Sequence, residues 1–382
     1  MEIYFDHAAT TFCDADAAAV VQQVMVVDYG NPSSLHRKGL AAEHHIKAAK
    51  EALAKILKVQ EKELYFTSGG TESNNLAIIG AALAHRRSGN HIITSAIEHP
   101  AVLAACEHLA TEQGMEVTYI PVNQAGQVCM DALKAALRPE TILVSIMHVN
   151  NEVGAIQPVA AIGALIKAYN QNIIYHVDSV QGFGKFEIFP TKAQIDLLSA
   201  SAHKIHGPKG VGLLYMKDKT KLQPLFFGGQ QQKNIRSGTE NVPGIAGFGV
   251  AAKKCFQNRD EHYAFVSTLR DYFVAQLQSL GNVEVHSGST NPYIISVAIK
   301  GIKAEVLLHA LGDQGIYISS GSACASNHPA ISGVLKAMGV AKDGLESTLR
   351  FSLDPSNTIA EIEQTMLLLR QQVPLLRRFT RR

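Results

Sequence analysis

Residues 173–178, with the sequence Ile-Ile-Tyr-His-Val-Asp, are typical of a buried β-strand that ends in a carboxylate. The run is apolar and rich in β-branched side chains, which favours an extended conformation inside a sheet. In open α/β sheets, ligands bind beyond the carboxyl ends of the strands. We therefore expect Asp178 to face a ligand site at the edge of such a sheet.

Helical and β-rich segments alternate on the N-terminal side of this strand. The predicted helices cover residues 41–57, 100–113, 130–137 and 159–169, and the predicted strands cover residues 91–94, 116–120 and 141–145. Such alternation indicates an α/β fold, in which helices cover both faces of a mostly parallel central sheet. After about Cys255 the pattern changes to a long helix over 260–279, strands over 294–299 and 349–353, and helices over 303–311 and at the C-terminus. This second pattern predicts a smaller α+β domain.

Downstream of the strand, residues 202–210 (Ala-His-Lys-Ile-His-Gly-Pro-Lys-Gly) place Lys204 among small residues and histidines. A lysine amine reacts with carbonyl groups only when it is partly deprotonated, and burial or nearby positive charge lowers its pKa. An isolated lysine of this kind is more often a solvated loop cation. Lys204 and Asp178 together, however, are the two groups that a pyridoxal phosphate enzyme needs. The lysine forms a Schiff base, and the carboxylate keeps the pyridine nitrogen protonated.

A candidate phosphate site lies at residues 66–75, Phe-Thr-Ser-Gly-Gly-Thr-Glu-Ser-Asn-Asn. Gly69 and Gly70 allow a tight turn, and the N-terminus of a helix that starts at Thr71 or Ser73 offers N–H donors to an anion. Alone, this sequence is more often an ordinary strand-to-helix turn. It matches neither a Walker loop nor the dinucleotide fingerprint, which disfavours nucleoside triphosphates and nicotinamides.

Composition sets the limits of the function. A chain of 382 residues, 46% of them apolar and 18% charged, can bury a large core and is expected to form two lobes. The formal net charge of +2 is too small to recruit nucleic acid. We find no signal peptide and no apolar run long enough to span a membrane, so we expect a cytoplasmic protein.

The five cysteines are Cys13, Cys106, Cys129, Cys255 and Cys324, and no two of them form a CxxC pair. This spacing argues against a structural zinc site and a disulfide framework. We interpret the first four as packing or surface residues. Cys324 differs, because the small polar residues around it cannot bury a thiol in an apolar core. It is a candidate nucleophile, and the alternative is a bystander thiol on a loop.

Further motifs follow in order along the chain. They are 4–11 (Tyr-Phe-Asp-His-Ala-Ala-Thr-Thr), 30–36 (Gly-Asn-Pro-Ser-Ser-Leu-His), 98–102 (Glu-His-Pro-Ala-Val), 149–154 (Val-Asn-Asn-Glu-Val-Gly), 176–181 (His-Val-Asp-Ser-Val-Gln), 236–241 (Arg-Ser-Gly-Thr-Glu-Asn), 319–324 (Ser-Ser-Gly-Ser-Ala-Cys) and 350–352 (Arg-Phe-Ser). With these motifs, nearly the whole chain resembles the cysteine desulfurases of the NifS/IscS-like group, which have the aminotransferase-like fold of pyridoxal phosphate enzymes. The resemblance implies a large coenzyme-binding domain over residues 14–256. It also implies a discontinuous small domain, residues 1–13 and 257–382, that carries the Cys324 loop.

The resemblance also implies a reaction, the conversion of L-cysteine to L-alanine with a persulfide formed on Cys324. Lys204 holds pyridoxal 5′-phosphate and then moves the Cα proton, and His99 stacks on the coenzyme ring and shuttles protons. The implied coenzyme-binding residues are Gly70, Thr71, His99, Asn151, Asp178, Gln181, Ser201, His203, Lys204 and Thr239, the last from the other subunit of a homodimer. Arg350 is the implied clamp for the substrate carboxylate, with Asn31 and Asn151 as weaker candidates.

Some alternatives stay open at this point. A selenocysteine lyase or a transaminase would share Lys204 and Asp178, and a non-catalytic sulfur-relay protein would share the coenzyme site. A zinc site made of His99, His203 and His206 is the weakest rival, because the usual ligand spacing is missing. The sulfur acceptor is expected to be a protein, either an iron–sulfur scaffold or a tRNA thiolation enzyme. Between Gly229 and Arg236 the family would have a glycine followed by a Gln-Glu-Arg-like run. This chain has Gln-Gln-Gln-Lys-Asn at residues 230–234 instead, so substrate entry or acceptor docking could differ there.

Overall fold

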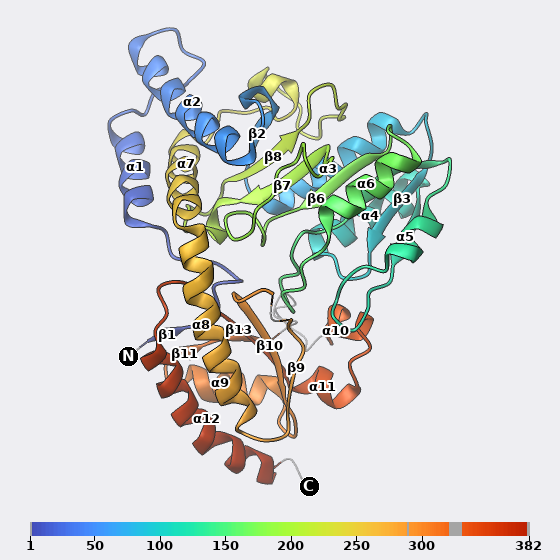
Figure 1. Cartoon of the computed structure of the whole chain (residues 1–382). Helices are drawn as coiled ribbons and strands as arrows, with labels where there is room; N and C mark the ends of the chain where they lie inside the picture. Colours follow the sequence, from blue (N-terminus) through green and yellow to red (C-terminus); the bar gives the residue numbers. More distant parts are fainter. Residues whose placement is uncertain (1, 289, 321–330, 380–382) are drawn as a thin grey trace.

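The larger part of the molecule is built on a seven-stranded sheet in the order β2-β8-β7-β6-β5-β3-β4 (Figure 1). The computed structural model describes residues 2–288, 290–320 and 331–379. The strands are β2 (Leu64–Thr67), β3 (His91–Ser95), β4 (Glu116–Ile120), β5 (Thr141–Ser145), β6 (Ile174–Asp178), β7 (Leu197–Ser201) and β8 (Gly212–Met216). The pairs from β4 to β7 are all parallel, and β8 runs antiparallel to both of its neighbours. The predicted mostly parallel α/β sheet is thus confirmed.

Helices cover both faces of this sheet. They are α1 (Ala15–Val26), α2 (Arg37–Leu57), α3 (Gly70–His85), α4 (Pro100–Gln113), α5 (Met130–Ala136), α6 (Val159–Tyr169) and α7 (Val242–Gln257). Tyr175 and Val177 of β6 belong to the core cluster that includes residues of α2, α6 and α7, whereas Ile174 packs in the cluster under α3 and α4. Because β6 is buried on both faces, its sequence is a continuous apolar run rather than an alternating one.

A second core lies below the sheet in Figure 1. Its four-stranded sheet has the order β12-β13-β10-β9, and β1 pairs in parallel with β11. The elements are β1 (Ile3–Tyr4), β9 (Val283–Val285), β10 (Ile294–Ile299), β11 (Ile316–Tyr317), β12 (Ser319–Ser320), β13 (Thr348–Ser352), α8 (Arg259–Gln278), α9 (Ala304–Gly312), α10 (Gly333–Ala337), α11 (Lys342–Ser347) and α12 (Ile359–Phe379). Phe5 near the N-terminus packs against Phe273 and Phe351 of this core. The residue boundaries of the two lobes stay a prediction.

Within the described ranges, the structure contains no helix with the length and apolar character needed to cross a membrane.

Backbone contacts with the N-terminal segment hold the Lys204 loop in place. The N–H and the hydroxyl of Thr11 donate to the carbonyl oxygen of His203, at 3.0 and 2.8 Å, and the Thr11 hydroxyl accepts from the N–H of His206 at 2.8 Å. The ring Nε2 of His206 lies 2.8 Å from Oδ2 of Asp354, which follows β13. The loop that carries Lys204 is therefore attached to the smaller lobe at two points.

Replacing Asp354 with asparagine is expected to destabilise the protein in a pH-dependent way. Burial opposes ionisation of this carboxyl, but the hydrogen bond and charge of His206 hold its pKa well below the usual value. A depressed native pKa stabilises the fold above the unfolded pKa of about 4, and this contribution is lost as the pH falls further. We expect Asp354→Asn to lower the free energy of unfolding by about 2 kcal/mol near pH 7.

Urea unfolding of both proteins across this pH range measures the effect, and the difference between them should shrink as the pH falls below about 4. Asp313→Asn is the matched control, because Asp313 is exposed. A difference for Asp354→Asn that stays constant through the acid range would contradict the explanation.

Candidate active site

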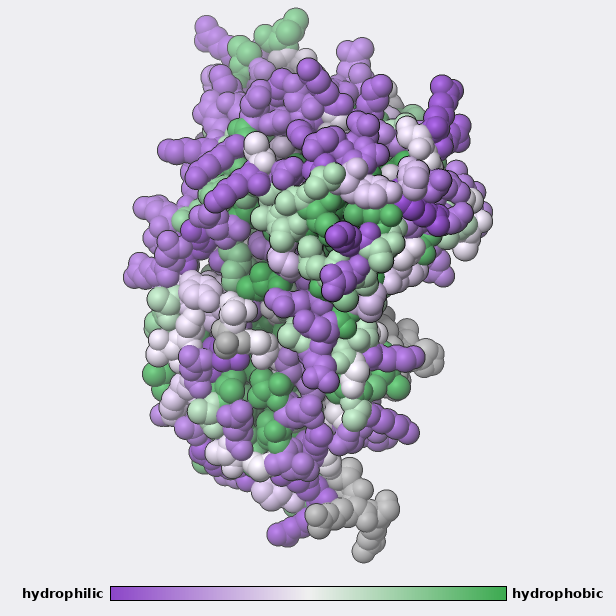
Figure 2. All heavy atoms as spheres, turned by 45° about the vertical axis from the view of Figure 1, so that its right-hand side comes forward, coloured by the Kyte–Doolittle hydropathy of each residue, from purple (hydrophilic) through white to green (hydrophobic). Residues whose placement is uncertain are grey.

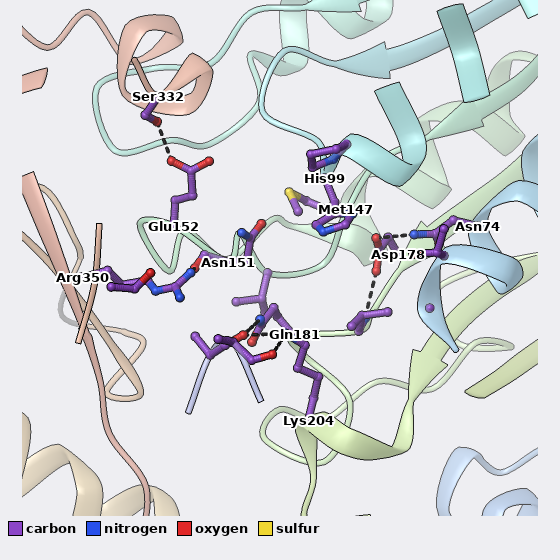
Figure 3. A pocket seen from close by; sticks show the side chains of 18 of the residues that line it. Asn74, His99, Met147, Asn151, Glu152, Asp178, Gln181, Lys204, Ser332 and Arg350 are labelled. Atoms are coloured by element: carbon purple, nitrogen blue, oxygen red, sulfur yellow. Dashed lines mark hydrogen bonds between the residues drawn. The ribbon is translucent and has the colours of Figure 1, made fainter. Parts of the chain in front are cut away.

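A cavity of about 640 Å³ opens where the carboxyl ends of the central strands face the smaller lobe (Figure 3). Several of the residues predicted from the sequence line it, namely Gly70, Thr71, His99, Asn151, Asp178, Gln181, His203, Lys204 and Arg350. Most of these come from segments that follow β2, β3, β5, β6 and β7, as expected for a parallel sheet. Arg350 comes from β13 on the other side of the cavity.

Lys204 ends a short 3₁₀ turn directly after β7. Its Nζ donates to the carbonyl oxygens of Ala8 and Ala9 at 2.6 and 2.8 Å. The amine therefore lies between the end of the sheet and the N-terminal segment, with its side chain rising into the cavity (Figure 3).

Asp178 is the last residue of β6 and is buried. Its Oδ2 accepts from Nδ2 of Asn74 at 2.7 Å, and its Oδ1 accepts from the N–H of Val180 at 2.9 Å. Burial raises the pKa of Asp178, while the two hydrogen bonds and the charges of His99 and Lys204 act in the opposite direction. The carboxyl is thus fixed in orientation at the cavity wall. Sequence reasoning did not single out Asn74, although its position one turn after Gly70 on α3 is the signal that places it there.

The start of α3 forms a cradle beside Asp178. Gly70 is the first residue of this 16-residue helix, and no side chain caps its first turn at Gly69. A Cβ at Gly70 would lie 2.6 Å from Cγ2 of Val180, so a larger residue here would force Val180, in the segment after β6, to move. The N–H groups of the first turn and the helix dipole favour an anion at this end of the cavity.

Two histidines line the cavity in neutral form. His99 caps α4, and its Nδ1 accepts from the N–H of Ala101 at 3.1 Å, which leaves the proton on Nε2. Burial lowers the pKa of His99 and lowers that of His203 to about 4. Nδ1 of His203 lies 3.1 Å from the hydroxyl of Thr10. Each ring therefore has a defined neighbour that orients it.

Two polar side chains near Lys204 have unused hydrogen-bonding capacity. Nε2 of Gln181 donates to the carbonyl oxygen of Ala8 at 2.7 Å, but its Oε1 has no partner among the described residues. The hydroxyl of Ser201, buried at the end of β7, also lacks a partner there. Ser201 is not among the residues that line the cavity. Because buried polar atoms are rarely left unpaired, these two groups point to a ligand in this region.

Arg350 faces Lys204 across the cavity. One terminal nitrogen of its guanidinium lies 2.8 Å from Oδ1 of Asp6, and the other donates to the carbonyl oxygen of Asn151 at 2.9 Å. Its Nε has no partner among the described residues, and the side chain is 5% exposed. A buried guanidinium held in this way is suited to bind a carboxylate. Sequence reasoning missed Asp6, which holds the guanidinium in place.

Besides Ser201, three predicted residues are not placed in this cavity. Asn31 is exposed in the connection between α1 and α2, where its Oδ1 accepts from the N–H of Ser33, so within one chain the expectation that it lies near Arg350 is not met. The connection projects from the top of the molecule, away from the smaller lobe (Figure 1). Thr239 lines a separate cavity of about 120 Å³. Cys324 lies outside the described residues.

The unusual segment 230–234 lies beside Thr239. Gln232, Lys233 and Asn234 have φ angles of 46°, 54° and 65°, in the left-handed region that few non-glycine residues adopt. Oε1 of Gln232 accepts from the N–H of Phe66, and its Nε2 donates to Glu240. The segment is thus attached to the edge strand β2 rather than to the Lys204 cavity.

The model of the class-V aminotransferase family matches residues 3–365. A protein named cysteine desulfurase IscS from Dictyoglomus turgidum is 40% identical over 379 residues, which cover 98% of this chain and 95% of that protein. One of the same name from Methanosarcina thermophila is 41% identical over 377 residues, covering 98% and 93%. Among solved structures, a NifS-like protein superposes with a TM-score of 0.94 at 36% identity and covers 98% of this chain and 100% of that one. A NifS-like protein from Rickettsia africae has a TM-score of 0.86 at 32% identity, with 98% and 99% covered.

Proposed function

This chain belongs to the class-V aminotransferase family and is a cysteine desulfurase, and we propose that it uses pyridoxal 5′-phosphate on Lys204 and carries the released sulfur as a persulfide on Cys324. One observation carries the proposal. Lys204 shares a single cavity with a buried carboxylate, Asp178, on one side and a buried guanidinium, Arg350, on the other. Lys204 and Asp178 together suit pyridoxal phosphate, whose aldehyde reacts with an amine and whose ring nitrogen pairs with a carboxylate. Arg350 suits the carboxylate of an amino acid substrate.

The described residues fit this coenzyme. The uncapped start of α3 at Gly70 suits its phosphate, and His203 lines the same cavity. Asp178, held by Asn74 and Val180, would pair with the pyridinium nitrogen. The unpaired Oε1 of Gln181 can accept a hydrogen bond from the coenzyme, and the hydroxyl of Ser201 can donate one to it or accept one from it. When bound, the coenzyme supplies an electron sink that makes the Cα–H bond of the substrate acidic.

The chain's own groups orient the substrate and move its protons. Arg350 binds the carboxylate of L-cysteine, with Asp6 and the carbonyl oxygen of Asn151 holding the guanidinium in position. The amine of Lys204, which lies in the same cavity, takes the Cα proton. His99, with its proton on Nε2, is placed to exchange a proton at the cavity wall.

Cys324 completes the reaction in this proposal. Its thiolate attacks the sulfur of L-cysteine and forms a sulfur–sulfur bond as the carbon–sulfur bond breaks. The electron pair of the broken bond passes to the substrate carbon, which takes up a proton, so the products are L-alanine and a Cys324 persulfide. Ser319 and Ile331, which lie on either side of segment 321–330 in sequence, both line the cavity. The described residues on both sides of the segment that carries Cys324 therefore lie at the cavity where the thiol is needed.

A homodimer would bring Thr239 to the coenzyme. The connection between α1 and α2 exposes apolar side chains, including Tyr29 (67%) and Leu35 (98%). Figure 2 shows hydrophobic atoms exposed at the top of the molecule, the end from which this connection projects in Figure 1. Such side chains are typical of protein interfaces. We infer that a second copy covers this surface, with Asn31 in the contact and Thr239 reaching the partner's phosphate site.

Incubating the coenzyme-loaded protein with L-cysteine and a thiol reductant tests the function. We expect L-alanine and sulfide in equal amounts, without any need for a 2-oxo acid. A transaminase would require the 2-oxo acid and make no alanine from cysteine, and a selenocysteine lyase would act on L-selenocysteine alone. Either result would contradict the proposal. We propose that, in the cell, the acceptor of the sulfur is a protein of iron–sulfur cluster assembly or of tRNA thiolation.

A further inference from the structure

The two ends of segment 321–330 are attached to different parts of the molecule. On the N-terminal side, Ser319 and Ser320 form β12, which pairs with β13 of the smaller lobe, and Ser319 stands directly opposite Arg350. On the C-terminal side, the chain continues through Ile331 and Ser332 into α10. Both ends line the Lys204 cavity.

Helix α10 packs on the loops of the larger lobe. Val334, Leu335 and Met338 form one apolar cluster with Met147 and Val153, which lie in the loop that follows β5. This cluster fixes α10 against the loop that carries Asn151 and Glu152. Apolar packing of this kind fixes the distance between α10 and the loop, but by itself it does not fix how the helix is rotated about its axis or shifted along it.

A hydrogen bond between Ser332 and Glu152 fixes the orientation of α10 on this loop. The hydroxyl of Ser332 donates to Oε2 of Glu152 at 2.5 Å and accepts from the N–H of Leu335 at 3.1 Å, so one hydroxyl caps α10 and ties it to the larger lobe. Ser332 is 5% exposed. The backbone N–H of Glu152 donates to Oδ1 of Asn150 at 2.8 Å, which orients the loop below it. In Figure 3, Glu152 points from this loop toward Ser332, with Arg350 nearby.

We propose that Glu152 is a positioning residue that, through the hydroxyl of Ser332, holds the start of α10 and thereby fixes where the chain bearing Cys324 returns to the cavity. The proposal rests on the proposed function, because positioning matters for turnover only if Cys324 is the nucleophile. Ser332 lies eight positions after Cys324 in the sequence, so a displaced α10 would move one anchor of the nucleophile's segment. Burial raises the pKa of Glu152 to about 7, while the Ser332 hydrogen bond and the charge of Arg350 act in the opposite direction.

The test compares Glu152→Met, Ser332→Ala and the double variant, all loaded with coenzyme. Methionine keeps the length of the side chain but cannot accept the hydrogen bond from Ser332 as a carboxylate does. Small misplacements of a reacting group are costly, so each single variant should lower kcat by about tenfold and leave KM within about twofold. Because both changes break the same bond, the double variant should be no slower than the slower single variant. Ser332→Thr keeps the hydroxyl and should retain nearly full kcat. Glu284→Met is the matched control and should leave kcat unchanged, because Glu284 pairs with Lys300 on the surface.

Amide hydrogen exchange of residues 333–338 gives a readout that needs no turnover. Both single variants should speed exchange in this peptide by about tenfold, and Glu284→Met should not. Unchanged exchange in Glu152→Met, multiplying effects in the double variant, or a raised KM with normal kcat would each overturn the proposal. If the wild-type protein makes no alanine from cysteine, the proposed function fails, whereas the exchange result still decides whether the Glu152 anchor exists.

Discussion

Lys204→Ala protein is expected to bind no coenzyme covalently and to lose turnover of L-cysteine by about a thousandfold or more. Among the described residues that line the cavity, Lys204 is the one lysine, so the change removes both the covalent attachment and the base for the Cα proton. Visible absorbance, together with the intact mass after reduction with borohydride, measures the attachment. Alanine release measures turnover.

A second variant separates chemistry from folding. Nζ of Lys204 donates to the carbonyl oxygens of Ala8 and Ala9, so alanine also removes two contacts with the N-terminal segment. Lys204→Arg keeps the charge and can keep these contacts, but it forms no Schiff base, and it should be equally inactive. Lys217→Ala is the matched control, because Lys217 is a largely exposed lysine paired with Asp196. A Lys204→Arg protein that still carries coenzyme after reduction would contradict the assignment.

Cys324→Ala protein is expected to bind coenzyme and L-cysteine normally, yet to release alanine about a thousandfold more slowly and to form no persulfide. The coenzyme site is formed by residues of the larger lobe, so removing this thiol should leave the visible spectrum unchanged. Mass spectrometry after one turnover should find the extra sulfur on Cys324 of the wild-type protein only. Normal desulfuration by the variant would eliminate this mechanism.

The remaining cysteines supply the control. Cys129 is exposed, Cys106 is buried, and burial raises the pKa of the Cys106 and Cys255 thiols to about 12. Thiols with so high a pKa carry almost no thiolate near neutral pH and are poor nucleophiles. Cys129 is exposed but does not line the Lys204 cavity, so Cys129→Ala should desulfurate at the wild-type rate. A loss in this variant that equals the loss in Cys324→Ala would mean that the sulfur path is different.

Some elements with a strong local pattern were predicted to the residue, whereas others have bounds that differ by one to four residues, as in α2, which begins at Arg37 rather than at residue 41. Elements with a weak pattern were not predicted. Helices α4 and α6 and strands β4, β5 and β10 have the predicted bounds. Helix α7 was not predicted, because Gly244, Gly247 and Gly249 in its sequence are more typical of a loop than of a helix. In the fold, these glycines allow close packing, since a Cβ at Gly249 would lie 2.9 Å from the Cα of Ala49 on α2. Strand β7 was missed because Ser199 and Ser201 interrupt its apolar pattern, and its pairing with β6 and β8 is visible only in the sheet.

By itself, the sequence determined which chemical groups follow which strands. Asp178 was identified because it ends an apolar strand, and Lys204 because it lies among small residues and histidines before a glycine-rich run; both are local properties of the chain. The tertiary structure alone decided which distant groups meet. Asp6 and Arg350 are 344 positions apart, and Glu152 and Ser332 are 180 apart, so no local pattern relates them. The first contact forms when the N-terminal segment packs in the second core, and the second forms when α10 packs on the loop after β5. Hydrogen bonds act over about 3 Å, so both contacts depend on where the burial of apolar side chains has carried each backbone.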